Sequence, residues 1–148
     1  MHLIIGSLYQ WGVVSVYYTS YFHAKDQGVT LESTAIAFPL MMACIGLTMR
    51  LGLFLAVKTH PIILMTVGQV LCASVVFVSS FMTTFWLFIL FYGILFGLFA
   101  GLSFMIPIYE CNNYLVGKKI YVNGLILIGT GCGPVVFGLF SYFYINPN

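Results

Sequence analysis

Charged side chains are scarce in this chain. Its 148 residues include five Lys and Arg and three Asp and Glu, or 5% of the sequence, whereas a soluble domain carries about 25%. This shortage excludes a water-soluble core. The net charge of +2 is too small to indicate a nucleic-acid partner, and no basic stripe is present. Hydrophobic residues make up 61% of the chain, which is typical of a membrane protein.

The hydrophobic residues gather in five long stretches, and seven of the eight charged residues lie outside them; the exception is Arg50. Each stretch holds about 20 residues or more, the length that crosses a hydrocarbon core about 30 Å thick. Such runs cross as helices because lipid offers the backbone no hydrogen-bond partners. We therefore expect an all-α polytopic membrane protein. Residues 1–148 would form a single transmembrane domain with about five transmembrane helices, at 3–22, 33–55, 62–81, 85–108 and 120–145.

Motifs of catalysis and of metal binding are missing as well. The four cysteines show no CxxC or Cys/His spacing, so we expect no metal site and no cofactor. His2, His23 and His60 lie at the ends of spans rather than together. No G-x-S-x-G, H-E-x-x-H or phosphate-binding loop occurs. The sequence therefore argues against an enzyme.

The loops predict an orientation in the membrane. Lys58, Lys118 and Lys119 lie in the loops after even-numbered spans, and Arg50 lies toward the same side. The opposite side has Lys25 alone. Because cytoplasmic loops carry an excess of Lys and Arg, we expect the N-terminus inside and the C-terminus outside.

Small residues predict tight packing of two spans. The fourth span contains two successive GxxxG steps, which let another helix approach closely, at Gly93, Gly97 and Gly101. The fifth span is richer still in such residues and includes Gly131, Gly133 and Pro134. The second group either packs against a neighbour or allows a bend, because proline removes a backbone hydrogen bond. The two interpretations are compatible.

Two segments carry a family resemblance. Residues 92–107, with their glycine steps ending near Pro107, resemble the glycine-rich fourth helix of major facilitator superfamily transporters, closest to the monocarboxylate and oxalate/formate branch. Residues 114–133, with the Lys118-Lys119 pair and a later Gly-x4-Gly pattern, resemble the opening of that family's fifth helix. The resemblance implies helices one to five of that fold, an incomplete N-terminal half without the sixth helix and the second half.

The chain departs from the family pattern at the inner gate and in the first helix. The family's loop between helices two and three usually reads Gly-x4-Asp-Arg/Lys-x-Gly. Here Gly52 is followed by Val57 in place of Asp, then Lys58, then His60 in place of the second Gly. The acidic residue that the branch often carries in its first helix is also absent.

Polar residues inside the spans are candidates for a central cavity. Gln10, Tyr17 and Tyr21 share one face of the first span by their i+7 and i+4 spacing. Asn123 and Thr130 are seven residues apart in the fifth span. Helices one, four and five contribute to the cavity in the superfamily, so the resemblance implies that these residues line a substrate site. Alternatively, they only hydrogen-bond to neighbouring helices.

Arg50 is the strongest single candidate for a gate. It precedes Lys58 by about 12 Å along a helix, so its guanidinium either snorkels to the inner interface or forms a gate or an anion contact. Its expected partner is Glu110, and Lys58 is the alternative. Lys118 and Lys119 would complete this charge network on the same side.

The resemblance implies transport of a small organic anion, monocarboxylate-like, by alternating access and often with a proton. The partners would be the lipid bilayer and the remaining transporter half or other membrane helices. The rival hypothesis is a non-transporting membrane subunit with a truncated transporter-like fold, packed in a larger complex through the glycine face of the fourth span. Because five spans cannot form two matched halves, we expect a fragment of a larger protein.

The size of the native product tests this expectation. An antibody against the loop at residues 109–119 should detect a band several times heavier than the 16.5 kDa chain in source membranes. A band at 16.5 kDa would contradict the fragment hypothesis and favour the rival.

Overall fold

The computed structural model describes residues 2–25, 28–115 and 117–145, and every regular element in these ranges is helical. In chain order the elements are α1 (His2–Gly6), the 3-10 segment η1 (Ser7–Gln10), α2 (Trp11–His23), α3 (Leu31–Ala35), α4 (Ala37–Lys58), α5 (Pro61–Ser79), α6 (Phe85–Phe88), the π-helical segment η2 (Ile89–Leu95), α7 (Phe96–Phe104), α8 (Ile106–Tyr114) and α9 (Lys119–Ile145).

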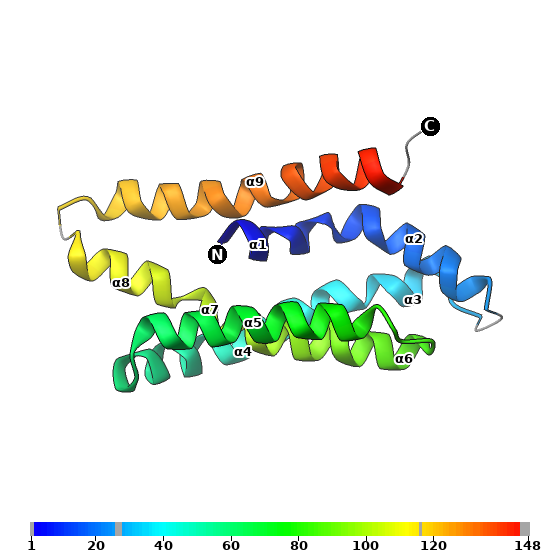
Figure 1. The fold of residues 1–148 in the computed structure, drawn as a ribbon, viewed down its shortest axis with the longest axis horizontal. Coiled ribbons are helices and arrows are strands. Elements are labelled where there is room, and N and C mark those ends of the chain that lie inside the picture. The colour runs from blue at the N-terminus through cyan, green and yellow to red at the C-terminus, as the bar shows by residue number, and fades with distance from the viewer. Residues whose placement is uncertain (1, 26–27, 116, 146–148) are drawn as a thin grey trace.

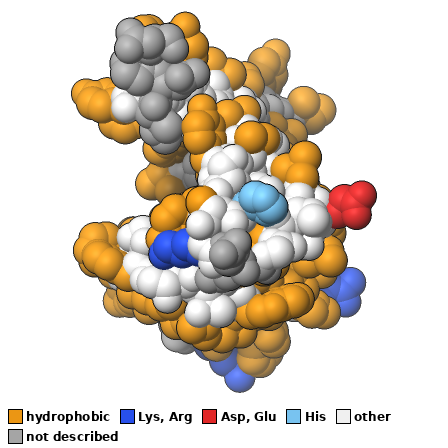
Figure 2. Space-filling model, turned by 90° about the vertical axis from the view of Figure 1, so that its right-hand side faces the viewer, with side chains coloured by type: hydrophobic (Ala, Val, Ile, Leu, Met, Phe, Trp, Pro, Cys, Tyr) orange, Lys and Arg blue, Asp and Glu red, His pale blue; other side chains and the backbone are white. Residues whose placement is uncertain are grey.

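Among the described residues, four helical runs are long and apolar enough to cross a membrane: Leu31–Lys58, Pro61–Ser79, Phe85–Tyr114 and Lys119–Tyr144. They match the second to fifth predicted spans, with ends shifted by a few residues. Figure 2 views the end of the bundle where α2 connects to α3, and it shows hydrophobic side chains along the flanks with only scattered charged ones. The prediction of an all-α polytopic membrane protein is confirmed, and these flanks contact the lipid bilayer.

The first predicted span, 3–22, is helical but is not one of these four runs. It consists of α1, η1 and α2, and it begins beside the middle of α9 rather than at the end of the bundle (Figure 1). His2 accordingly lies against Thr130, near the midpoint of α9. A fifth crossing by residues 3–22 and the side of the membrane on which each terminus lies both stay predictions.

Local signals set several helix boundaries. Thr30 caps α3, since its side chain accepts a hydrogen bond from the Ser33 amide at 3.3 Å. Pro61 occupies the first turn of α5, where its missing N–H costs nothing. Gly28, in the connection before α3, has a φ of 60°, a left-handed conformation that favours glycine.

The tightest packing joins α7 to α4, and α5 covers another side of α7. A Cβ added at Gly97 would lie 2.8 Å from the Met41 carbonyl oxygen, and one at Gly101 would lie 2.6 Å from that of Ile45. Backbones can approach so closely only where no side chain intervenes. This face of the fourth span therefore packs within the chain against α4, and it is not left open for a partner helix as the rival hypothesis assumed.

A second close contact places α9 on α1 and η1 (Figure 1). A Cβ at Gly133 would lie 2.5 Å from the Leu3 carbonyl oxygen and 2.7 Å from Gly6 Cα, whereas one at Gly131 would meet nothing within 4 Å. The helix runs unbroken from Lys119 to Ile145 with Pro134 inside it. The Pro134 bend stays a prediction.

Alanine substitutions can test the α4–α7 contact. Gly97→Ala should lower the free energy of unfolding in nanodiscs by about 1–3 kcal/mol, because the added methyl group overpacks the interface. Gly46→Ala is the matched control: it lies in α4 with nothing within 4 Å of its Cβ position. Thermal unfolding of both variants checks this, and an equal loss of stability in the two would contradict the packing described.

Candidate functional site

A cavity of about 470 Å³ opens between the first helical segment, α5, the π-helical region and α9. Its wall combines aromatic and aliphatic side chains with a few amide and hydroxyl groups: Ile4, Ser7, Gln10, Val14, Cys72, Ala73, Val76, Phe77, Tyr92, Phe96, Phe137, Phe140 and Ser141. We call this the central cavity. Apolar walls with a small number of placed polar groups are typical of small-molecule sites.

Gln10 connects two sides of the central cavity. Its side-chain Nε2 donates to the Phe137 carbonyl oxygen at 3.1 Å and to Ser141 Oγ at 2.9 Å. The residue is buried, at 7% exposure. Because a buried amide must find partners, these bonds hold the end of η1 against α9. The two N–H donors of the amide are both used, so Gln10 orients Ser141, whose own hydroxyl proton remains available to a bound molecule.

Two irregular helical segments face this cavity. The 3-10 segment η1 supplies Ser7 and Gln10, and the π-helical segment η2 supplies Tyr92. Mid-helix segments of these kinds often mark functional sites because they re-aim side chains that a regular α-helix would turn away. Here they place polar groups from two neighbouring helical runs on one wall.

An aromatic stack supports the wall behind Tyr92. The Tyr92 ring centroid lies 5.1 Å from that of Trp11, 5.3 Å from that of Phe88 and 5.8 Å from that of Phe96, with interplanar angles of 28°, 10° and 6°. Offset stacking of this kind holds rings more firmly than area burial alone. Tyr92 is therefore held rigidly, with its ring at the cavity surface. No charged side chain stands among the described residues that line the cavity.

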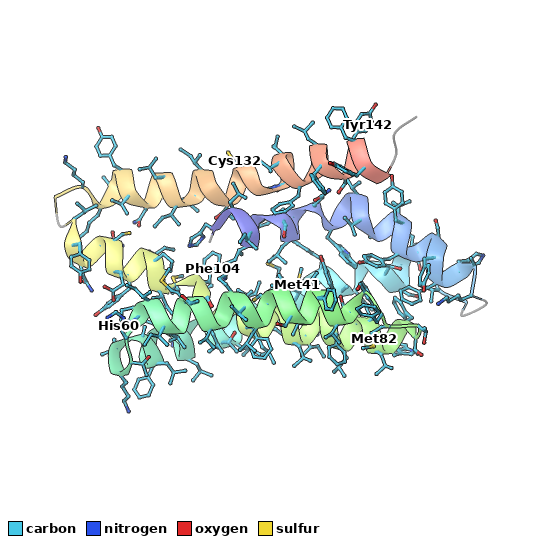
Figure 3. The ribbon with its side chains drawn as sticks, in the orientation of Figure 1. Met41, His60, Met82, Phe104, Cys132 and Tyr142 are labelled. Carbon is cyan, nitrogen blue, oxygen red and sulfur yellow. The ribbon has the colours of Figure 1, made fainter. Side chains whose placement is uncertain are left out.

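The structure does not bring the predicted cavity residues together. Gln10 lines the central cavity, whereas Tyr17 and Tyr21 line a second cavity of about 300 Å³ that also includes Met82 (Figure 3). Thr130 is buried, and its Oγ1 lies 3.1 Å from Nδ1 of His2. The Oδ1 atom of Asn123 is buried without a hydrogen-bond partner. Substrate binding by these residues stays a prediction.

The predicted charge network is spread over one end of the bundle. Arg50 is exposed on α4, and Lys58 Nζ lies 4.3 Å above the Phe54 ring. Glu110 lines a separate cavity of about 290 Å³ together with His60, which Figure 3 labels where α4 connects to α5. No ion pair links any of these groups within the described ranges of the chain, and Lys118 and Lys119 are exposed. A gating role stays a prediction.

Sequence reasoning missed Ser141, Tyr92 and the burial of His2. Ser141 lies four residues after Phe137 and eleven after Thr130, so extending the polar face of the fifth span by one turn would have found it. Tyr92 gave no such signal, because its position depends on the π-helical segment. His2 was read as a residue at a span end, and only the position of α1 beside α9 reveals otherwise.

Comparison with known proteins gives one similarity. No family profile and no solved structure matches the sequence. The chain is 23% identical over 184 residues to apicoplast pyruvate carrier 1 of Toxoplasma gondii, an alignment that covers 99% of this chain and 33% of that protein. The chain therefore spans about a third of the length of the curated relative that it matches. The relative is a carrier and not an enzyme.

Substitution of Gln10 tests its structural role at the cavity. Gln10→Leu should lower the free energy of unfolding by about 0.5–2 kcal/mol, because both hydrogen bonds to α9 are lost. Ser141→Ala should cost less, since the bond to the Phe137 carbonyl survives. The control is Ser74→Ala on α5, where the exposed hydroxyl bonds only to Val70 of its own helix. Thermal unfolding measures the three variants. If Gln10→Leu is no less stable than Ser74→Ala, this structural role of Gln10 is contradicted.

Proposed function

We propose that this chain is part of a membrane carrier for pyruvate or a related small monocarboxylate. The observation that carries the proposal is the similarity to the Toxoplasma gondii pyruvate carrier, which extends over nearly the whole chain. Four apolar helical runs of membrane-spanning length agree with that role. The proposed fold is the N-terminal part of a major facilitator transporter, and the proposed mechanism is alternating access around a site near the membrane midplane.

The central cavity supplies groups that suit such a substrate. A 2-oxo acid presents carboxylate and keto oxygens, which accept hydrogen bonds, and a methyl group, which prefers apolar contact. Ser141 Oγ and the Tyr92 hydroxyl are donors on the cavity wall, while Phe96, Phe137 and Phe140 offer apolar surface. In this proposal the wall positions the substrate, and the rest of the carrier encloses it from the opposite side.

The charged end of the bundle would serve as the inner gate. Lys58, Lys118 and Lys119 would approach carboxylates of the opposite half when the cavity closes on this side, because charge pairs form readily where water is excluded. Arg50 and Glu110 would extend the same network. The glycine contacts between α4 and α7 would keep this part rigid, so that it rocks as one body.

A second candidate is a non-transporting membrane subunit with a truncated transporter-like fold. The observation that favours it is the outer face of α9, which exposes large apolar side chains along most of its length, including Leu125, Ile128, Val135, Leu139 and Phe143. A partner helix could cover this face. The two candidates differ in one measurable property, since only the first moves a solute.

Uptake of labelled pyruvate distinguishes them. Membranes that contain the native protein should accumulate pyruvate above protein-free background, and Ser141→Ala should raise KM about tenfold, which is the loss of about 1.4 kcal/mol of binding. Cys132→Ala is the control, because Cys132 is exposed on the side of α9 that faces away from α1 (Figure 3). A folded protein that leaves uptake at background would refute the carrier and favour the subunit.

A further inference from the structure

His2 is a titratable side chain buried inside the bundle. It is 7% exposed and lies beside Thr130, near the midpoint of α9. Its ring contacts Phe104 edge-on, with centroids 5.1 Å apart and planes at 70°; Figure 3 labels Phe104 close to the start of α1. Ionisable residues at membrane depth are costly, and their usual justification is function.

The hydrogen bonds of Thr130 favour one protonation pattern of the ring. If the Thr130 hydroxyl donates to the Ile126 carbonyl oxygen, which lies 3.2 Å away, its oxygen accepts from His2 Nδ1–H at 3.1 Å. With the proton on Nδ1, a neutral imidazole carries its lone pair on Nε2. That Nε2 atom is buried and has no hydrogen-bond partner. The Phe104 backbone carbonyl lies near the ring and would accept from a proton placed there.

No counter-charge faces this nitrogen among the described residues. The elements in closest contact with α1 are η1, α7 and α9, and α4 borders the same small cavity, with buried Cys44 and exposed Arg50 and Lys58 as its titratable groups. Helix α7 has no titratable side chain, and the titratable groups of η1 and α9 are exposed: Tyr9, Lys119, Tyr121, Cys132, Tyr142 and Tyr144. Glu110, on α8, lines the separate cavity beside His60. An imidazolium at His2 would thus be an unpaired buried charge, which is stable only when an anion enters with it.

We infer that Nε2 of His2 is a proton-accepting site inside the membrane, which takes up the proton that accompanies a carboxylate. A proton from hydronium or from a carboxylic acid forms the Nε2–H bond, leaving water or a carboxylate, while Nδ1–H stays bonded to Thr130. Nothing is oxidised or reduced. The coupling to a carboxylate rests on the proposed function, because that function supplies the monocarboxylate. The protonation of Nε2 does not depend on the proposed function.

The position of Phe104 suggests how a proton reaches the site. The Phe104 ring touches His2 and also lines a cavity of about 180 Å³ between α1, η1 and α4, with Ile5, Leu8, Met42, Ile45 and Met49 among its other residues. A rotation of this one ring is a small movement that would join Nε2 to that cavity. The Phe104 ring thus separates His2 from the small cavity, and His2 exchanges protons with that cavity only when the ring moves.

Nitrogen NMR of the histidines tests the protonation directly. The chain has three histidines, so a sample with labelled imidazoles in nanodiscs gives three sets of signals. His23 and His60 are exposed and serve as internal references, each assigned by a His→Gln variant. His2 should show the Nδ1–H neutral form at high pH and gain a proton on Nε2 as pH falls. An Nε2–H form throughout, or no protonation before unfolding, would overturn the inference.

Thr130 provides a matched pair of variants for the same measurement. Thr130→Ser keeps the hydroxyl and should preserve the Nδ1–H form. Thr130→Val has a similar shape but no acceptor, and it should shift the ring to a mixture of neutral forms. If both variants keep the same ring form, Thr130 does not orient His2, and the assignment of Nε2 as the acceptor is wrong.

Transport then tests the coupling. In vesicles that hold the full carrier and a pH-sensitive dye, pyruvate should drive proton uptake, and His2→Gln should reduce protons moved per pyruvate at least tenfold. His60→Gln should leave the ratio unchanged. An unchanged ratio in His2→Gln would overturn the coupling. A third outcome is that the unsubstituted protein fails to transport pyruvate while NMR shows that His2 is protonated as expected. That result would refute the proposed function and the coupling, but it would leave the protonation site in place.

Discussion

Close contact between helix backbones at glycine is the constraint on which the rest of the structure depends. In a bilayer the lipid tails are as apolar as the helices, so van der Waals fit and interhelical hydrogen bonds must hold the bundle together. Gly97 sets α7 against α4, and Gly133 sets α9 against α1 near Gly6. The second contact brings η1 near enough to α9 for Gln10 to reach the Phe137 carbonyl.

The 3-10 and π-helical segments both lie beside the central cavity. A 3-10 turn and a π-helical turn are tolerated at membrane depth only where the backbone is covered by protein or borders a cavity. The segments η1 and η2 meet that condition, and both contribute to the central cavity. They turn Ser7 and Tyr92 toward the same wall, although these residues lie in different helical runs.

The buried polar groups divide into two kinds. Gln10 and Thr130 have partners on neighbouring helices, and they stabilise the packing of α9. The Nε2 atom of His2 has no hydrogen-bond partner among the described residues, and burying such an atom carries a desolvation cost. His2 and Gln10 lie on the same helical run, about 12 Å apart along its axis, and His2 does not line the central cavity.

The sequence by itself determined which segments are helical, that the second to fifth of them are long enough to cross lipid, and that Gly97 lies where a helix can approach. Length and residue type suffice for these conclusions, because they depend on the solvent and on local geometry. Only the tertiary structure decided that Gln10 contacts Ser141 and that His2 is buried. It also decided that Tyr17, on the same helical run as Gln10, lines a different cavity. Each of these depends on which helix lies opposite, and that is set by the crossing of backbones far apart in the chain.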